Sequence, residues 1–191
     1  FDKAEQAIKK ALEINTRISE VQAMAHNFNN LGLIHFNKKD HKSAIEYFKK
    51  ALKLNRDLFN NYEVAQNLNN LSMIYLDLKN YKLAYSYIKE LEEITNSINS
   101  VQVKLDYYNT KSKYFSDIKE FRQALIYKEK FVYMKDSIFS LGRIKQFNQL
   151  KTLANAEKEI QKLDFLEKIN ALQDEKIENQ NYIQFASGIV F

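Results

Sequence analysis

The sequence predicts an all-α protein in which pairs of antiparallel helices repeat along the chain. The 191 residues include no proline and only three glycines, so few residues interrupt a helix. Small and ring-bearing residues recur every 40 residues, and apolar residues within each unit recur three and four positions apart, as on one helix face. We therefore expect helices throughout and few tight turns.

The repeat is marked by an alanine that follows three residues after a ring-bearing side chain. The alanines are Ala4, Ala44, Ala84 and Ala124, and the ring-bearing residues are Phe1, His41, Tyr81 and Phe121. Alanine lets the two helices of a pair approach closely at no cost in helix propensity. On the first helix of each pair Gly32, Ser72 and Ser112 supply the small residue.

The pattern gives the helices in order, alternating between first and second members of a pair. The predicted helices span residues 2–18, 21–37, 41–57, 60–78, 81–98, 101–117 and 121–139. Residues 1–18 are the second half of an earlier pair, and the full pairs are 21–57, 60–98 and 101–139. Asp40 and Asn80 precede second helices and can cap them. Because each pair buries its apolar face only against its neighbours, residues 1–138 predict a right-handed α-solenoid with a concave inner wall.

The motif Phe28-x-x-Leu31-Gly32-x-x-His35, followed by Ala44-x-x-x-Phe48-x-x-Ala51, resembles the tetratricopeptide repeat. The second pair keeps this pattern, whereas the third has Lys111 and Lys128 at apolar positions. The ordinary repeat has roughly 34 residues, whereas the period here is 40, and the proline that ends the ordinary repeat is missing. The resemblance covers residues 1–138 and implies that they bind a protein or peptide.

If residues 1–138 form such a solenoid, the first helix of each pair lines its concave groove. The groove residues predicted from the pattern are Asn29, Asn30, Leu33, Phe36, Gln66, Asn69, Asn70, Met73 and Asn109. An asparagine amide both donates and accepts, which matches the alternating groups of an extended peptide backbone. The alternative is that these asparagines bridge neighbouring helices and serve only the scaffold.

After about Ser140 the repeat is lost, and residues 141–181 become rich in Lys, Glu, Gln and Asn. Apolar residues spaced by three and four predict one long amphipathic helix. Since a long helix with one narrow apolar stripe needs a partner, we interpret 141–181 as a parallel homodimeric coiled coil. Packing against the solenoid is the alternative, because the stripe is not a clean heptad.

Residues 182–191 contain no charged side chain. They cover about half of the roughly twenty residues that a bilayer requires. One interpretation is the start of a membrane span with Tyr182 at the interface; the other is a buried helix end or an apolar cap.

The order of repeats, polar helix and apolar segment resembles the sensor half of bacterial membrane signalling proteins, namely tetratricopeptide-containing sensor histidine kinases and helix-turn-helix regulators. The resemblance implies that the repeats lie outside the cytoplasm, that the membrane begins just beyond residue 182, and that an output domain follows residue 191. The alternative is a soluble cytoplasmic adaptor, or a peptide-regulated response protein, without a membrane anchor.

Several function classes are not expected in this segment. The chain has no cysteine, its His35 and His41 occupy aromatic positions of the repeat, and His26 has no ligand partner at helical spacing, so no metal site is predicted. Without a phosphate loop or a Ser–His–Asp set we expect no catalytic residue and no cofactor. The net charge is +5, but lysines and glutamates are interspersed, which argues against nucleic-acid binding.

Overall fold

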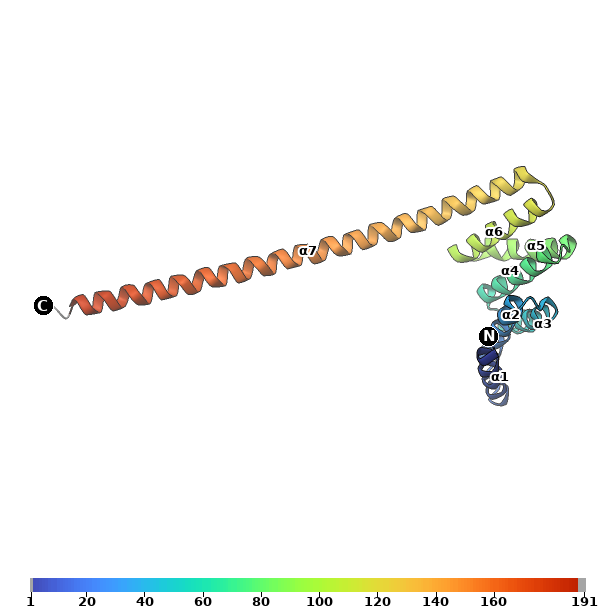
Figure 1. The fold of residues 1–191 in the computed structure, drawn as a ribbon, viewed down its shortest axis with the longest axis horizontal. Helices are drawn as coiled ribbons and strands as arrows, with labels where there is room; N and C mark the ends of the chain where they lie inside the picture. Colours follow the sequence, from blue (N-terminus) through green and yellow to red (C-terminus); the bar gives the residue numbers. More distant parts are fainter. Residues whose placement is uncertain (1, 189–191) are drawn as a thin grey trace. The chain divides into compact units, whose positions relative to one another are not determined.

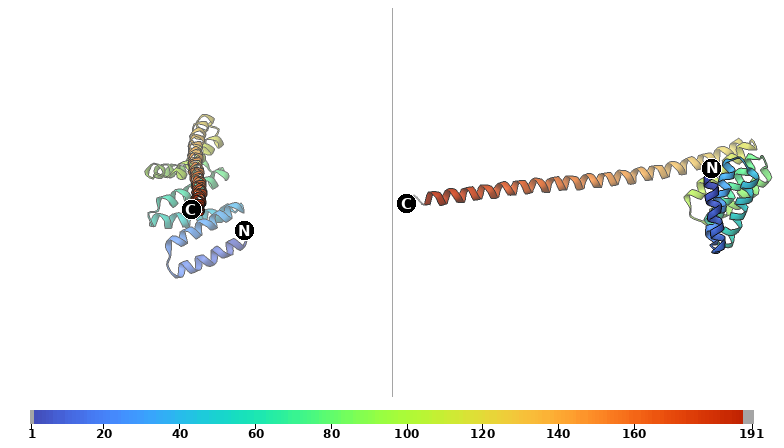
Figure 2. Two further views of the ribbon diagram at one scale, coloured as in Figure 1. Left: turned by 90° about the vertical axis from the view of Figure 1, so that its left-hand side faces the viewer. Right: turned by 60° about the horizontal axis from the view of Figure 1, so that its bottom comes forward.

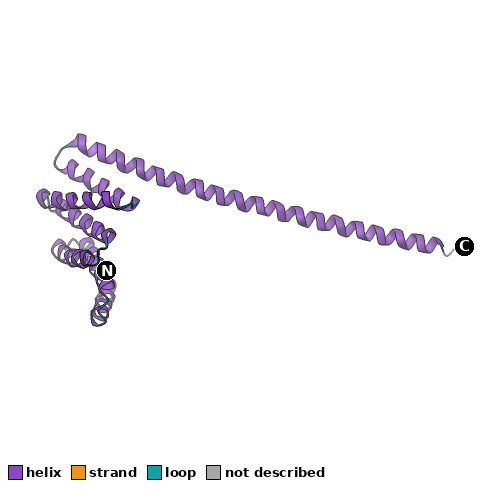
Figure 3. Cartoon of the chain, turned by 180° about the vertical axis from the view of Figure 1, so that it is seen from behind, coloured by secondary structure: helices purple, strands orange, loops and turns teal. Residues whose placement is uncertain are grey.

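The computed structural model describes residues 2–188, with side chains described through residue 138 and at most positions from there to 177. In residues 2–188 the chain forms seven helices joined by short turns (Figures 1 and 3). The helices are α1 (Asp2–Arg17), α2 (Val21–Asn37), α3 (His41–Asp57), α4 (Asn61–Asp77), α5 (Tyr81–Ser97), α6 (Val101–Asp117) and α7 (Phe121–Gly188). The predicted all-α class is confirmed, and the bounds of the first six helices differ from the prediction by at most one residue.

The chain divides into two compact units, Phe1–Asp136 and Ser137–Phe191. The first unit contains α1 to α6 and the beginning of α7, and successive helices in it run antiparallel, as Figure 2 shows for α1 and α2. Its core lies among α3, α4, α5 and α6 and includes Phe48, Leu68, Leu71, Ile74 and Ile88.

Small residues let the helices of a pair cross closely, as the sequence predicts. Ala44 and Ala84 are fully buried. At Gly32 a Cβ atom would lie 2.7 Å from Cδ1 of Phe48, whose ring fills the space left by the missing side chain. In the third pair the Ser112 hydroxyl donates to the Ala124 carbonyl at 2.9 Å, which draws α6 against the first turns of α7.

The turns differ from our expectation, because tight turns form without glycine. Five non-glycine residues adopt left-handed backbone angles: Ser19 (φ 58°), Lys39 (φ 63°), Phe59 (φ 54°), Lys79 (φ 56°) and Lys119 (φ 66°). Around Lys39, the Lys39 amide donates to the Phe36 carbonyl and the Asp40 amide donates to the His35 carbonyl, both at 2.9 Å. This is the Schellman arrangement that ends a helix, usually built on glycine.

The predicted helix caps are confirmed. Asp40 accepts a hydrogen bond from the Ser43 amide at 3.1 Å, and Asn80 accepts one from the Leu83 amide at 3.2 Å. Hydrogen bonds from Ser43, together with the neighbouring His35, lower the pKa of Asp40 to about 2. Asn60 and Ser100 cap α4 and α6 in the same way.

The long helix differs from its predicted bounds, because no break separates residues 121–139 from 141–181. Helix α7 runs without interruption from Phe121 to Gly188. The only glycine in its interior near the expected break is Gly142, which costs a helix about 1 kcal/mol relative to alanine but does not end it. A change in sequence pattern therefore marks the boundary of the repeat and not the end of a helix.

Large apolar side chains of the second unit are exposed in this chain. Leu150 and Leu153 are each 66% exposed, and Leu163 is 59% exposed. Within the described part of the chain, no helix is both long and apolar enough to cross a bilayer. The apolar segment 182–191 falls outside the described side chains, and residues 189–191 fall outside the described backbone as well.

Candidate functional site

Helices α2, α4 and α6 lie side by side and present what we call the first-helix face. Side-chain amides and a hydroxyl connect them. The Asn67 Nδ2 atom donates to Asn29 Oδ1 at 2.9 Å, joining α4 to α2, and the Thr110 hydroxyl donates to Asn69 Oδ1 at 2.6 Å, joining α6 to α4. The repeat therefore positions equivalent asparagines, Asn29 and Asn69, as acceptors toward the next first helix.

The predicted groove residues fall into two groups. Asn29 and Asn69 have their oxygens engaged between helices, and the Asn70 amide donates to Asn29 Oδ1 at 3.4 Å. Phe36 and Met73 pack against the core. The others lie on the first-helix face, where Asn30, Leu33 and Asn109 are exposed and Gln66 is half-buried; Asn70 and Met73 are also only half-buried and reach this face in part. The structure thus places part of the asparagine pattern in the scaffold and leaves the rest accessible to a ligand.

Two buried amides of this network are not groove residues in the sequence prediction. Asn55 in α3 is 2% exposed and Asn67 in α4 is fully buried, and the Asn55 Nδ2 atom donates to Asn67 Oδ1 at 2.9 Å. Asn67 lies 40 residues after Asn27, so the sequence shows an asparagine at the same position of two repeats. The sequence does not predict that Asn67 is buried, because the spacing of apolar residues identifies only apolar core positions.

Charged groups of the first-helix face gather at α4 and α6. The Lys113 amine lies 3.1 Å from an Asp117 oxygen and 3.5 Å from an Asp77 oxygen. Two turns earlier in α6, Asp106 accepts a hydrogen bond from Gln102 at 3.0 Å. Burial raises the pKa of Asp106 above its ordinary value, and the hydrogen bond from Gln102 offsets only part of this effect.

The third pair contains a buried lysine where the other pairs have leucine. Lys111 is 7% exposed, whereas its equivalents Leu31 and Leu71 are 1% and 0% exposed. Its amine donates to both oxygens of Glu92 at 2.8 Å and lies 4.8 Å from the centre of the Tyr127 ring. The Tyr107 hydroxyl also donates to Glu92.

The pKa shifts within this cluster favour the charged forms of Lys111 and Glu92. Burial alone would raise the pKa of Glu92, but hydrogen bonds from Lys111 and Tyr107 and the lysine charge together lower it. For Lys111 burial opposes the charge, and Glu92 and Tyr127 outweigh burial and raise the pKa. Burial and the adjacent Glu92 carboxylate raise the pKa of Tyr107. The cluster joins α5 to α6 through one ion pair and reaches the start of α7 through the contact of the Lys111 amine with the Tyr127 ring.

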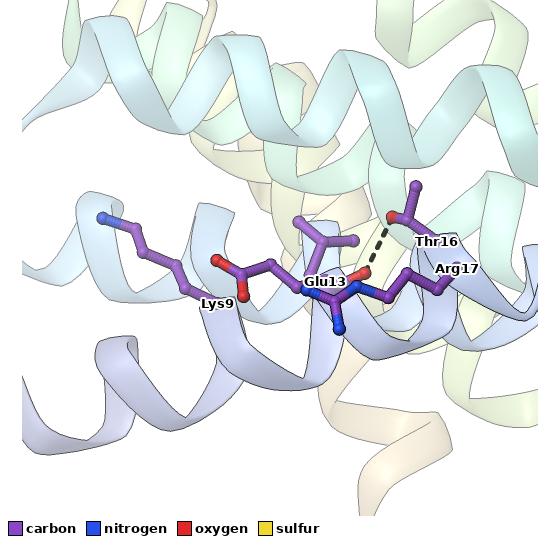
Figure 4. Close-up of a pocket in the computed structure, with 5 residues that line it drawn as sticks. Lys9, Glu13, Thr16 and Arg17 are labelled. Atoms are coloured by element: carbon purple, nitrogen blue, oxygen red, sulfur yellow. Dashed lines mark hydrogen bonds between the residues drawn. The ribbon is translucent and has the colours of Figure 1, made fainter.

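The described hollows do not coincide with the first-helix face. One lies on α1 and is lined by Lys9, Leu12, Glu13, Thr16 and Arg17 (Figure 4). Another lies on α7, with Leu125, Val132 and Tyr133 among its lining residues. Both are open to solvent. Among the described side chains no group of three His, Asp or Glu could hold a metal ion.

Comparison with known proteins assigns the repeats. Residues 28–58 and 65–97 each match the tetratricopeptide repeat family. The chain contains tetratricopeptide repeats. Tetratricopeptide domains generally bind peptides or proteins, so these repeats indicate a role in protein interaction. The matches cover the first two full pairs, in which the Leu–Gly or Leu–Ser motif and the following alanine are intact.

A solved structure shares the fold. The crystal structure of BtubC (BKLC) from P. vanneervenii superposes with a TM-score of 0.63 at 18% sequence identity. The match covers 72% of this chain and 57% of that chain, so this chain spans little more than half of its length. At this identity the similarity shows the fold of packed antiparallel pairs. No curated protein matches the chain in sequence.

Proposed function

We propose that the first-helix face of α2, α4 and α6 binds an extended segment of a partner protein and that the segment carries no catalysis. The accessible amides of Asn30 and Asn109 support this proposal, because they can pair with an extended backbone. Leu33 is exposed on the same face, and the half-buried Met73, which also packs against the core, offers a second apolar contact. The observation that carries the proposal is the parallel placement of these residues on repeats whose family binds proteins.

Site-specific photo-crosslinking tests this surface. A photoreactive residue at Met73 should crosslink a partner in cells, whereas the same residue at Lys89, exposed on α5, should not. The double variant Leu33→Ala and Met73→Ala should weaken capture while leaving the helical circular dichroism unchanged. Equal crosslinking from both positions would disprove a first-helix binding site.

The wider role that we propose is a sensor domain of a bacterial membrane-anchored signalling protein, with the repeats outside the cytoplasm. Its support is the order of segments: repeats, the long polar helix, and the uncharged residues 182–191. The competing role is a soluble cytoplasmic adaptor. Fractionation of the full gene product decides between them, because a sensor sediments with membranes after an alkaline wash and an adaptor stays in the supernatant.

We further propose that residues 141–181 form a homodimer in that sensor. The exposed leucines and isoleucines of this region support it, because an isolated helix gains most of its stability by burying such a stripe. Sedimentation equilibrium should show a dimer for the chain and a monomer for a version ending at Asp136. If the full chain is a monomer at high micromolar concentration, the dimer is wrong.

A further inference from the structure

Positive charge is distributed unevenly between the first and second helices of the pairs. The chain carries 29 lysines and arginines, yet α2 and α4 contain none. The second helix α3 alone contains four lysines and one arginine. The first helices α2 and α4 therefore carry no lysine or arginine, whereas the second helix α3 carries five.

The lysines of α6 do not make that face basic. Lys111 is buried against Glu92, and Lys113 is held between Asp77 and Asp117. The remaining one, Lys104, is two residues from Asp106, and side chains two apart point to different sides of a helix.

Carboxylates outnumber amines on this face. Asp106 and Lys113 are seven residues apart and share one side of α6, and Asp117 follows one turn later. Asp77 joins them from α4 through its contact with Lys113. Two carboxylates thus contact the one amine, and Asp106, two turns away along α6, has no cationic partner among the described residues.

We propose that the first-helix face selects a positively charged, extended segment of a partner protein. Its lysine or arginine side chains lie against Asp106, Asp77 and Asp117, and its backbone pairs with the exposed amide of Asn109. This inference rests on the proposed function, since it names the chemistry of the segment bound at the same face. An acidic segment, a nucleic acid or an anionic membrane is repelled there by the same carboxylates.

Selection from a random displayed peptide library against the full chain tests the inference. Selected peptides are sorted by whether the Leu33→Ala and Met73→Ala double variant abolishes their binding, which separates the first-helix face from other surfaces such as the lysine-rich helix α3. Peptides that depend on this face should carry a net positive charge. Their affinity should fall as salt is added, because exposed ion pairs are screened.

Charge-neutralising variants give the quantitative readout with one selected basic peptide. Asp106→Asn and Asp77→Asn should each weaken binding roughly two- to fivefold, as expected for exposed ion pairs. Glu93→Gln removes an exposed carboxylate from the second helix α5 and should leave affinity unchanged. Because Asp77 also contacts Lys113, Asp106→Asn serves as the variant that leaves that ion pair intact.

The outcomes separate this inference from the function on which it rests. Face-dependent peptides that are acidic, or aspartate variants that bind the basic peptide as tightly as the parent chain, overturn the charge selection and leave a protein-binding face in place. A library that yields no peptide dependent on Leu33 and Met73 overturns both.

Discussion

For the buried Lys111–Glu92 pair we predict that substituting one partner changes the stability of the fold differently from substituting the other. Glu92→Gln removes the charge that compensates a lysine only 7% exposed, whereas Lys111→Met leaves a carboxylate whose side chain is 40% exposed and can be hydrated. Breaking a fully buried pair costs about 3–5 kcal/mol. Because Glu92 is partly exposed, we expect a smaller loss, roughly 1–3 kcal/mol, for Glu92→Gln.

Lys111→Met should be neutral or stabilising. Methionine fills the space of the lysine stem at a position where the other pairs bury leucine, and replacing buried charge by apolar groups is often favourable by about 1–4 kcal/mol. The lost contacts of the amine with the Tyr107 and Tyr127 rings, at 5.0 and 4.8 Å, offset part of this gain. The double variant Glu92→Gln and Lys111→Met should recover most of the stability lost in Glu92→Gln alone.

Urea unfolding followed by circular dichroism measures the three variants, and pH gives a second readout. A carboxylate with a lowered folded pKa stabilises the fold above its unfolded pKa, near 4.3, and loses that contribution as pH falls toward the folded pKa. The parent chain should therefore lose more stability than Glu92→Gln between about pH 5 and pH 3. If Lys111→Met destabilises more than Glu92→Gln, the reasoning from burial is refuted.

Three further substitutions, each with a matched control, test the turns, the helix crossing and the amide network by the same unfolding measurement. Phe59→Gly should stabilise by about 0.5–1 kcal/mol, because it relieves a left-handed φ of 54° at a residue 89% exposed; Asn99→Gly, in a turn without positive φ, should give no gain. Gly32→Ala should cost about 1–3 kcal/mol by pressing a methyl group on Phe48, whereas Gly142→Ala, with nothing within 4 Å, should stabilise α7. Asn67→Ala should cost roughly 1–3 kcal/mol because it leaves the Asn55 amide unpaired, while the exposed Asn109→Ala should change stability little; equal effects would contradict the buried network.

The sequence predicts the helices of the first unit closely because their signals are local and repeated. Alanine, aromatic and capping residues return in register, so an error in one pair is corrected by the next. The turns were predicted poorly because a left-handed residue is ordinarily recognised by glycine, and here serine, lysine and phenylalanine adopt that conformation. Nothing in the composition distinguishes Lys39 or Phe59 from a helical residue.

At the candidate site the repeat pattern does not predict which asparagines are accessible. The register identified the first helices as one face, but it treated Asn29, Asn30, Asn69 and Asn70 as equivalent. Which amide bridges a neighbouring helix and which stays accessible depends on the angle at which α2, α4 and α6 pack, a property of the stack and not of one helix.

The same repeat explains how a basic chain can have first helices with few lysines. First helices contact both neighbouring pairs and each other, so most of their surface is enclosed and long charged side chains are excluded from it. Second helices leave one side to solvent, and in α3 this side accommodates four lysines and an arginine. Helix α6 does carry lysines, and of these Lys111 and Lys113 are each neutralised by a carboxylate from the same or an adjacent helix. Asp106 has no such partner among the described residues, and in the proposed complex it is the carboxylate that the basic segment neutralises.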